Sequence, residues 1–347
     1  MIKLRLACVG LFVLLLLAVP AASADRGMIV PPGTSVYEPG QKAIVAWNGE
    51  REALILSTDV YGSDNTWALE ILPLPSEPTV EAGKFDSFIA VQDLLLRYVG
   101  DMYSQRGYGK AGPENAPQLE VIFHEQIGAH DIIVAVVDNA QELVNWAENF
   151  LGARAQGISW GRLENLVEVY IQRGMEYWVF DLVDLSDYLK SREPIVYTFE
   201  SDLLYYPLEI SSLASGATEI TLYTLTSDKL DAQSVQESGF SIRSLEAGGE
   251  NFPLEFEVDE NDLQRIGSEV AELFEGKTWL TVLAYSGHLN DLSGDLTLAA
   301  AGGAEHPEPN RTFALLLTAA MIAALAVIFA LVYRISRLEQ HSSPSRS

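Results

Sequence analysis

The stretch KAIVAWNGEREALILSTDV, residues 42–60, decides the fold. Two apolar, β-rich runs, Lys42–Trp47 and Ala53–Val60, lie on either side of the dipeptide Asn48-Gly49. Asn-Gly is the strongest short hairpin signal, because the tight turn of a hairpin needs residues that tolerate positive φ. We therefore predict two paired antiparallel strands here.

The rest of the chain up to residue 298 shows both the helical spacing of apolar residues and short β-rich runs. Apolar residues spaced by three and four predict helices at Phe85–Tyr103, Ala140–Leu151 and Gly161–Gln172, and from a cap at Asp259 or Asn261 to about Phe274. Short β-rich runs predict strands at Trp67–Leu72, Leu119–His124, Asp131–Val137, Tyr177–Leu185, Ile195–Glu200, Tyr206–Ile210, Glu219–Thr226, Phe252–Val258, Trp279–Tyr285 and Leu292–Leu298. Because strands and helices do not alternate regularly, we predict an α+β fold with mainly antiparallel sheets and packed helices.

Several features predict how these elements end or join. Pro73 and its neighbours should stop the strand Trp67–Leu72 at an edge or a rim of a sheet, since proline cannot donate to a ladder. Asp138 or Asn139 can cap the predicted helix Ala140–Leu151. Residues 104–117 are rich in Gly and Pro and predict a loop, and residues 126–129 predict a hairpin turn between two strands.

The C-terminal region predicts a membrane anchor. Thr312–Tyr333 is a run of 22 uncharged residues, which as a helix would measure roughly 33 Å, enough for a hydrocarbon core of about 30 Å. A stalk at 299–311 precedes this single transmembrane helix, and a tail at 334–347 follows it. The tail holds three Arg against one Glu, which predicts that it is cytoplasmic and that the N-terminal domain lies outside.

The N-terminus predicts export. Residues 1–24 combine a basic start, a 14-residue apolar core from Leu6 to Val19 and the small-residue pattern Ala22-Ser23-Ala24, which together are typical of a cleaved signal peptide. An uncleaved anchor is the alternative, but the core is short for a span. The outer domain would then comprise residues 25–298.

Charge and cysteine content limit the partners and the chemistry that the protein can have. Residues 25–310 carry 16 basic and 47 acidic residues, a formal net charge of −31, which excludes nucleic acid as a partner. This surface could be merely solubilising, or it could bind cations or a basic partner. The only cysteine, Cys8, lies in the predicted signal peptide, so the mature protein is expected to have no disulfide and no thiol nucleophile.

Five blocks in sequence order resemble a known family. They are KAIVAWNGEREALILSTDV, ALEILPLPSEP, EVIFHEQIGAHDIIVAVVDNAQELVNWAEN, FESDLLYYPLEISSL and TWLTVLAYSGHLNDLSGDLTL, within residues 28–298. The chain resembles a family of secreted, membrane-anchored bacterial and archaeal proteins classed as a conserved domain of unknown function. The resemblance implies one continuous domain and supplies no catalytic residues. Relatives often have cysteines after the signal, where this chain has Asp25-Arg26-Gly27-Met28.

Metal and cofactor signals are weak. His124, His130 and Asp131 could share a metal across a hairpin turn, but they lack the spacing of a helical zinc site, and exposed turn residues are the favoured interpretation. The sets Asp181/Asp184/Asp187 and Asp259/Glu260/Asp262 do not match a calcium loop; they predict a solvated face and a helix N-terminus, with weak calcium binding left open. No phosphate or dinucleotide motif is present, and no cofactor is predicted.

Two contact surfaces are candidates. Tyr205-Tyr206-Pro207 and the rim Pro73–Pro78 could line a peptide or glycan groove, or could be core and edge residues. Ala319, Ala323, Ala326 and Ala330 form a small-residue stripe on which two membrane helices could approach, predicting a homodimer, although alanine is also common membrane filler.

These observations favour a non-enzymatic, single-pass, extracytoplasmic binding or cell-envelope module. The alternative is an envelope hydrolase that uses paired carboxylates, with or without a metal. With 47 acids in the outer part, an acidic pair by itself does not identify such a site.

Overall fold

The structure is a computed structural model. It describes residues 26–299 except 35, 38–40, 58, 63–65, 106–130, 186–189, 192–193, 215 and 248–249. The chain divides into two units, residues 1–301 and 302–347, and every described residue belongs to the first. Among the described residues no helix has the length and apolar character needed to cross a membrane. The predicted span Thr312–Tyr333 lies outside them.

The predicted hairpin forms and lies inside the largest sheet. β3 (Gln41–Trp47) and β4 (Arg51–Ser57) pair antiparallel, and Gly49 in the turn has φ +101°. Their sheet has eight strands in the order β14-β18-β13-β3-β4-β11-β7, with β17 also on β18. The other strands of this sheet are β14 (Ser241–Ile242), β18 (Thr278–His288), β13 (Ala217–Thr226), β11 (Ile195–Glu200), β7 (Thr79–Ala82) and β17 (Glu255–Val258). Only β3 and β13 pair in parallel among the described strands of this sheet.

A second sheet has four antiparallel strands in the order β1-β6-β9-β8. They are β1 (Gly27–Ile29), β6 (Thr66–Leu74), β9 (Tyr177–Leu185) and β8 (Asp131–Val136). Smaller pairings join β2 (Val36–Tyr37), β5 (Asp59–Gly62) and β10 (Lys190–Ser191), β12 (Leu204–Tyr206) with β19 (Leu296–Leu298), and β15 (Ser244–Ala247) with β16 (Glu250–Pro253).

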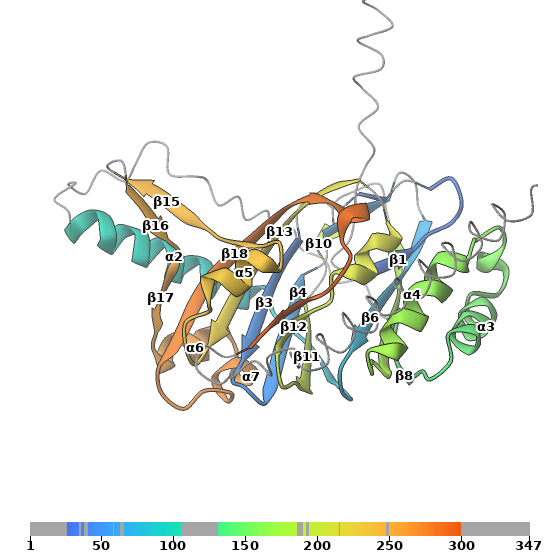
Figure 1. Cartoon of the computed structure of the whole chain (residues 1–347), viewed down its shortest axis with the longest axis horizontal. Coiled ribbons are helices and arrows are strands. Elements are labelled where there is room, and N and C mark those ends of the chain that lie inside the picture. The colour runs from blue at the N-terminus through green and yellow to red at the C-terminus, as the bar shows by residue number, and fades with distance from the viewer. Residues whose placement is uncertain are drawn as a thin grey trace, which may run out of the picture. The chain divides into compact units, whose positions relative to one another are not determined.

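The two sheets and the helices form four layers (Figure 1). α2 (Phe85–Gln105), α6 (Glu260–Ile266) and α7 (Ser268–Ala271) cover one face of the large sheet. The opposite face packs against the four-stranded sheet, whose outer face is covered by α3 (Ala140–Leu151) and α4 (Gly161–Gln172). Short elements complete the fold: α5 (Ala232–Glu237), η1 (Gly152–Ala155), η2 (Glu209–Leu213) and η3 (Leu289–Asp291). The predicted α+β class with mainly antiparallel sheets is confirmed.

Several element predictions differ from the structure, and three of them have a clear physical reason. β6 continues through Pro73 and lies between β1 and β9. Proline is tolerated at position 73 because β1 pairs only with residues 69–71, so that Pro73 has a neighbouring strand, β9, on one side only. The predicted strand Tyr206–Ile210 is the end of β12 followed by the 3-10 helix η2. The predicted helix to Phe274 breaks at Gly267 into α6 and α7. The strand Leu119–His124 and the hairpin turn lie outside the described residues.

Candidate functional site

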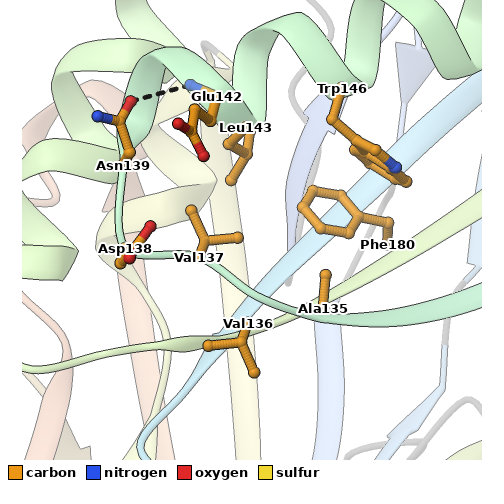
Figure 2. Close-up of a pocket in the computed structure, with 9 residues that line it drawn as sticks. All are labelled: Ala135, Val136, Val137, Asp138, Asn139, Glu142, Leu143, Trp146 and Phe180. Atoms are coloured by element: carbon orange, nitrogen blue, oxygen red, sulfur yellow. Dashed lines mark hydrogen bonds between the residues drawn. The ribbon is translucent and has the colours of Figure 1, made fainter.

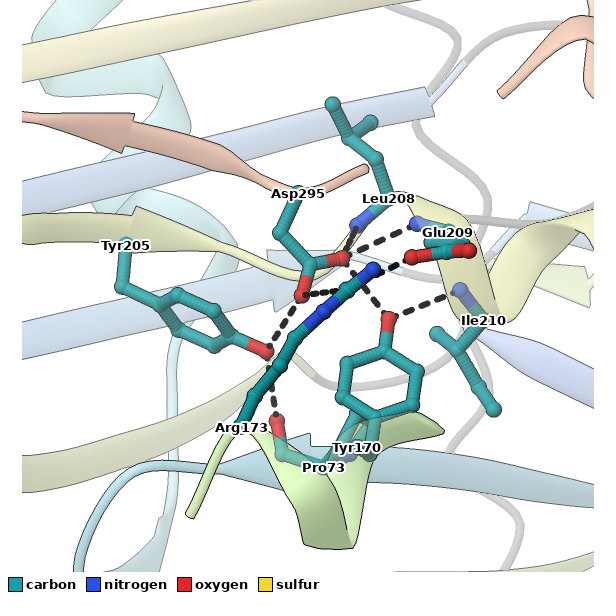
Figure 3. A network of polar contacts seen from close by, with 8 residues as sticks. All are labelled: Pro73, Tyr170, Arg173, Tyr205, Leu208, Glu209, Ile210 and Asp295. Carbon is teal, nitrogen blue, oxygen red and sulfur yellow. Dashed lines mark hydrogen bonds and ion pairs between the residues drawn. The ribbon is translucent and has the colours of Figure 1, made fainter. Parts of the chain in front are cut away.

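Asp295, just before β19, is the centre of a buried polar network (Figure 3). Its side chain is 5% exposed. Its Oδ1 atom accepts the Tyr170 hydroxyl at 2.7 Å and the backbone N–H groups of Leu208 and Glu209 at 2.8 and 3.0 Å. Its Oδ2 atom accepts the Tyr205 hydroxyl at 3.2 Å. The carboxylate therefore connects α4, β12 and the start of η2.

The two tyrosines of this network have further partners. The Tyr170 hydroxyl accepts the backbone N–H of Ile210 at 2.9 Å, and the Tyr205 hydroxyl also lies 3.2 Å from the carbonyl of Pro73. Tyr170 belongs to α4 because it continues the apolar stripe with Leu163 and Val167. Both rings are buried, at 0% and 2% exposure. Pro73 therefore supplies a hydrogen-bond acceptor to the network through its carbonyl, although it has no N–H to donate.

Arg173 closes the network on the solvent side. Its Nη1 atom lies 2.6 Å from Glu209 Oε2 and 4.0 Å from Asp295 Oδ2, and its side chain is 38% exposed. Burial raises the pKa of Asp295, whereas the hydrogen bonds from Tyr170 and the η2 backbone and the nearby Arg173 oppose this rise. Burial and the charge of Asp295 raise the pKa of Tyr170 and of Tyr205. Both tyrosines thus stay neutral donors at physiological pH.

The arrangement fills an anion site with the protein's own carboxylate. The first N–H groups of a helical turn have no partner within the turn, and here they point to Asp295. With two backbone donors, two hydroxyl donors and a guanidinium nearby, the carboxylate has little capacity left to accept a proton from a substrate. The role of Asp295 is therefore structural: its carboxylate joins α4, β12 and the start of η2.

A second acid, Glu52 of β4, is buried between the two sheets. Its side chain is fully buried, and Oε2 accepts the backbone N–H of Tyr205 at 2.7 Å. Burial raises the pKa of Glu52 well above its ordinary value, and the hydrogen bond from Tyr205 only partly opposes this.

Arg26, immediately before β1, forms a third buried cluster. Its guanidinium Nη1 lies 2.6 Å from Glu70 Oε2 and 3.7 Å from Asp181 Oδ2, and all three side chains are at most 2% exposed. Glu70 and Asp181 are direct cross-strand neighbours on β6 and β9. Like charges opposite each other are destabilising, so Arg26 is the cation that permits this pair. The Tyr197 ring lies 5.6 Å below the guanidinium.

A hollow of about 200 Å³ lies between β8 and α3 (Figure 2). Leu143, Trp146 and Phe180 form its apolar wall. Asp138 and Glu142 lie at its other end, beside the helix cap, where the Asn139 side chain accepts the Glu142 N–H at 3.0 Å. The predicted helix and its cap at Asn139 are confirmed.

The residues predicted for metal or calcium sites do not come together in the part of the chain that is described. His124, His130 and Asp187 lie outside the described residues, and Asp131 begins β8 opposite Leu182. No group of three His, Cys, Asp or Glu residues within the described ranges could hold a metal ion. The expected solvated face was wrong for Asp181, which is buried beside Arg26.

Other sequence predictions have mixed outcomes. Asp259 caps α6 by accepting the Asp262 N–H at 2.9 Å, as predicted for a helix N-terminus. The groove suggested for Tyr205 and Tyr206 was wrong, because both side chains are buried in the core. The alternative interpretation, that they are core residues, is confirmed. Sequence reasoning missed Asp295, Glu52 and the Arg26 cluster.

The family model described as "Uncharacterized protein conserved in bacteria" (DUF2330) matches residues 19–299, so the chain belongs to this family. The resemblance to a domain of unknown function is thereby confirmed. The signal peptide and the membrane helix stay predictions. No curated protein matches the chain.

Solved structures similar to the chain include baculovirus P35, with a TM-score of 0.40 and 11% identity over 77% of this chain and 97% of that one. The caspase-8/P35 complex contains another, with a TM-score of 0.37 and 9% identity over 75% of this chain and 96% of that one. TM-scores this low carry no argument about activity.

Proposed function

We propose that the chain is a single-pass, membrane-anchored extracytoplasmic protein whose outer domain is a non-enzymatic binding or cell-envelope module. One observation carries this proposal: the carboxylate of the buried residue Asp295 is occupied by hydrogen-bond donors from the chain itself. A general acid or nucleophile must instead present a group to a substrate. The acidic surface and the apolar side chains exposed on β8 and α2 are better suited to contact with another macromolecule.

In-cell photo-crosslinking tests the binding role. A photoreactive amino acid replaces, one at a time, an exposed apolar residue in different parts of the domain: Val136 on β8, Leu96 on α2 or Leu203 before β12. We expect a discrete adduct from at least one position in the native cells, and none from the buried control position Leu54. Absence of an adduct at every exposed position would contradict the proposal.

The envelope hydrolase remains the second candidate, because Asp295 has a raised pKa and lies near a second carboxylate, Glu209, with Arg173 between them. The substitutions Asp295→Asn and Glu209→Gln distinguish a structural role of these acids from a catalytic role. If both acids are structural, any loss of cellular function in these variants follows the loss of thermal stability. Loss of function at unchanged melting temperature would favour the hydrolase.

The anchoring part of the proposal rests on Thr312–Tyr333. A tag after Ser347 should be protected from protease added to spheroplasts, while the outer domain should be digested. Deletion of residues 312–347 should release the domain from the membrane fraction. Retention of the shortened protein in that fraction would show that another part of the chain holds it there.

A further inference from the structure

The turn between β3 and β4 holds the side-chain amide of Asn48 by three hydrogen bonds. The Oδ1 atom of Asn48 accepts the backbone N–H groups of Glu50 and Arg51 at 3.0 and 2.8 Å. Its Nδ2 atom donates to the carbonyl of Leu273, just after α7, at 3.0 Å. In Figure 1, α7 lies at the same end of the large sheet as this turn. The amide therefore connects an inner hairpin of that sheet with the helices that cover its face.

Gly49 follows this amide with a backbone nitrogen that no side chain hinders. It has φ +101°, and a Cβ atom there would meet no atom within 4 Å. In this described turn the hydrogen bonds use the N–H groups of Asn48, Glu50 and Arg51, and the N–H of Gly49 is not among them. A backbone nitrogen attacks the preceding side-chain amide most readily when it belongs to glycine, because glycine has no side chain in the way. Asn48 is the only asparagine of the chain that precedes a glycine.

The reaction between these two groups needs only water. The nitrogen of Gly49 forms a bond to Cγ of Asn48, and its proton passes through solvent to Nδ2. The bond from Cγ to Nδ2 breaks, so that ammonia leaves and a succinimide ring remains. Water then opens one of the two ring carbonyls and yields aspartate or isoaspartate at position 48. Negative charge develops on Oδ1 in the first step, and two backbone N–H groups donate to this atom, as they do in an oxyanion hole.

The contact with Leu273 opposes this reaction in the folded state. Ring closure makes Nδ2 tetrahedral and then expels it, so the hydrogen bond from Nδ2 to the Leu273 carbonyl must break. That bond is released when the segment after α7 moves away from the turn. Local openings of this kind cost less free energy than global unfolding. The side chains of Val270 and Leu273 hold the segment in place, because both belong to the core on the helix side of the large sheet.

The product changes the point where β3 and β4 join. A carboxylate at position 48 can still accept the N–H groups of Glu50 and Arg51, but it has no hydrogen to donate to the Leu273 carbonyl. Two oxygen atoms would then face each other. Isoaspartate also lengthens the backbone of the turn, and the turn of a hairpin sets the register of its strands. Either product therefore weakens the attachment of the segment after α7.

We propose that Asn48 is a site of spontaneous deamidation, and that its contact with Leu273 controls the rate. The domain keeps the asparagine while the segment after α7 is docked, and each opening of that segment exposes the amide to conversion. The change is irreversible, and its product holds the segment less well. Asn48 thus gives the folded domain a chemical lifetime, a property separate from the proposed binding role.

Peptide mapping of the full-length protein tests the inference directly. The protein is kept in mildly alkaline buffer made with 18O-water, and mass spectrometry follows the peptide that contains Asn48. We expect heavy oxygen to enter at position 48 in the native protein, and about tenfold faster or more in protein denatured with guanidinium. Asn139 also accepts a backbone N–H but precedes alanine, so it should stay unchanged. Equal rates in the two states would overturn control by the fold, and no conversion in either state would overturn the site.

Two matched variants locate the opening. Val270→Ala in α7 and Val144→Ala in α3 remove the same atoms from side chains that are at most 4% exposed, and the two lie in different cores. Val270→Ala should deamidate about tenfold faster than the wild type under native conditions, whereas Val144→Ala should match the wild type. Equal acceleration in both variants would mean that global unfolding sets the rate, which overturns the inference.

Two further measurements keep the test decisive. If Val270→Ala does not fold, the wild-type rate is measured at low guanidinium concentrations. A local opening exposes little surface, so the rate should stay nearly constant below the unfolding transition; a steep rise from the first addition would overturn the inference. Asn48→Asp imitates one product and should melt at a lower temperature than the wild type, because it cannot donate to Leu273. An unchanged melting temperature would overturn the weakened attachment on which the lifetime rests.

Discussion

At the scale of single residues, the buried carboxyl group of Glu52 makes the stability of the fold depend on pH. Because burial raises the native pKa of Glu52, the folded state takes up a proton more readily than the unfolded chain. Its favourable contribution is complete below the unfolded pKa of about 4.5 and is lost as pH rises through the native pKa. Alkaline conditions should therefore weaken the fold at this site.

Glu52→Gln should remove this dependence. The amide oxygen can still accept the Tyr205 N–H, but the side chain no longer ionises. We expect a higher melting temperature than wild type at pH 8 and a smaller fall between pH 5 and 8, at most about 1.4 kcal/mol per pH unit. Thermal unfolding across this range measures the effect, and Glu81→Gln on exposed β7 is the control. An unchanged pH slope would contradict burial as the source.

Tyr170→Phe tests the connector role of Asp295. The variant keeps the ring that packs edge-on against Trp178 but leaves Asp295 and the Ile210 N–H each without one partner. Loss of about 1–3 kcal/mol in the free energy of unfolding is expected, measured by denaturant titration. Tyr98→Phe, in a ring stacked on Phe256, should change stability by no more than about 0.5 kcal/mol. Similar losses in both variants would argue against the network.

At the scale of elements, β1 is fixed by a close approach at Gly27. A Cβ there would lie 2.5 Å from Ile210 Cγ1, so Gly27→Ala should force the core apart and cost roughly 1–3 kcal/mol. The same substitution at Gly100, in α2, meets no atom within 4 Å and should stabilise the protein by about 0.5–1 kcal/mol. Melting temperatures of the two variants should move in opposite directions. A shared direction would contradict the close approach.

Local patterns predicted elements well where one periodicity acts alone. α3 and α4 were predicted at their observed bounds, and the hairpin at Asn48-Gly49 was found because its turn chemistry is local. Tyr206–Ile210 looked like a strand because it is apolar and aromatic, but Asp295, distant in sequence, binds the backbone there and favours a 3-10 turn. Tertiary contacts of this kind leave no local signal.

The candidate sites were harder to predict for the same reason. Glu52 sits in a strand where alternation alone would place it inside, yet acids are normally assigned to the surface. Asp295 joins segments that are up to 125 residues apart. The apolar, β-branched run at Asp131–Val136 was visible in the sequence and identified β8, because a run of this kind is a local signal.

At the scale of the whole molecule, the predicted membrane helix is the segment for which the sequence predicts self-association. Ala323→Leu with Ala326→Leu should weaken association of the isolated helix in a membrane reporter assay, because the larger side chains prevent close approach along the small-residue stripe. Ala324→Leu, on another face, should have no effect. Equal association of all three helices would rule out this dimer face.

The interior position of Arg26 has a consequence for export. The predicted cleavage point after Ala24 is two residues before a side chain that is 2% exposed and bound to Glu70. Proteases cut backbone that is exposed and unpaired, so we expect the leader to be removed before β1 docks. Arg26→Ala should then be processed at least as fast as wild type in a pulse-chase measurement, although its folded domain loses roughly 3–5 kcal/mol. Slower processing would contradict this order, in which the first residues of the mature chain are the last to complete the fold.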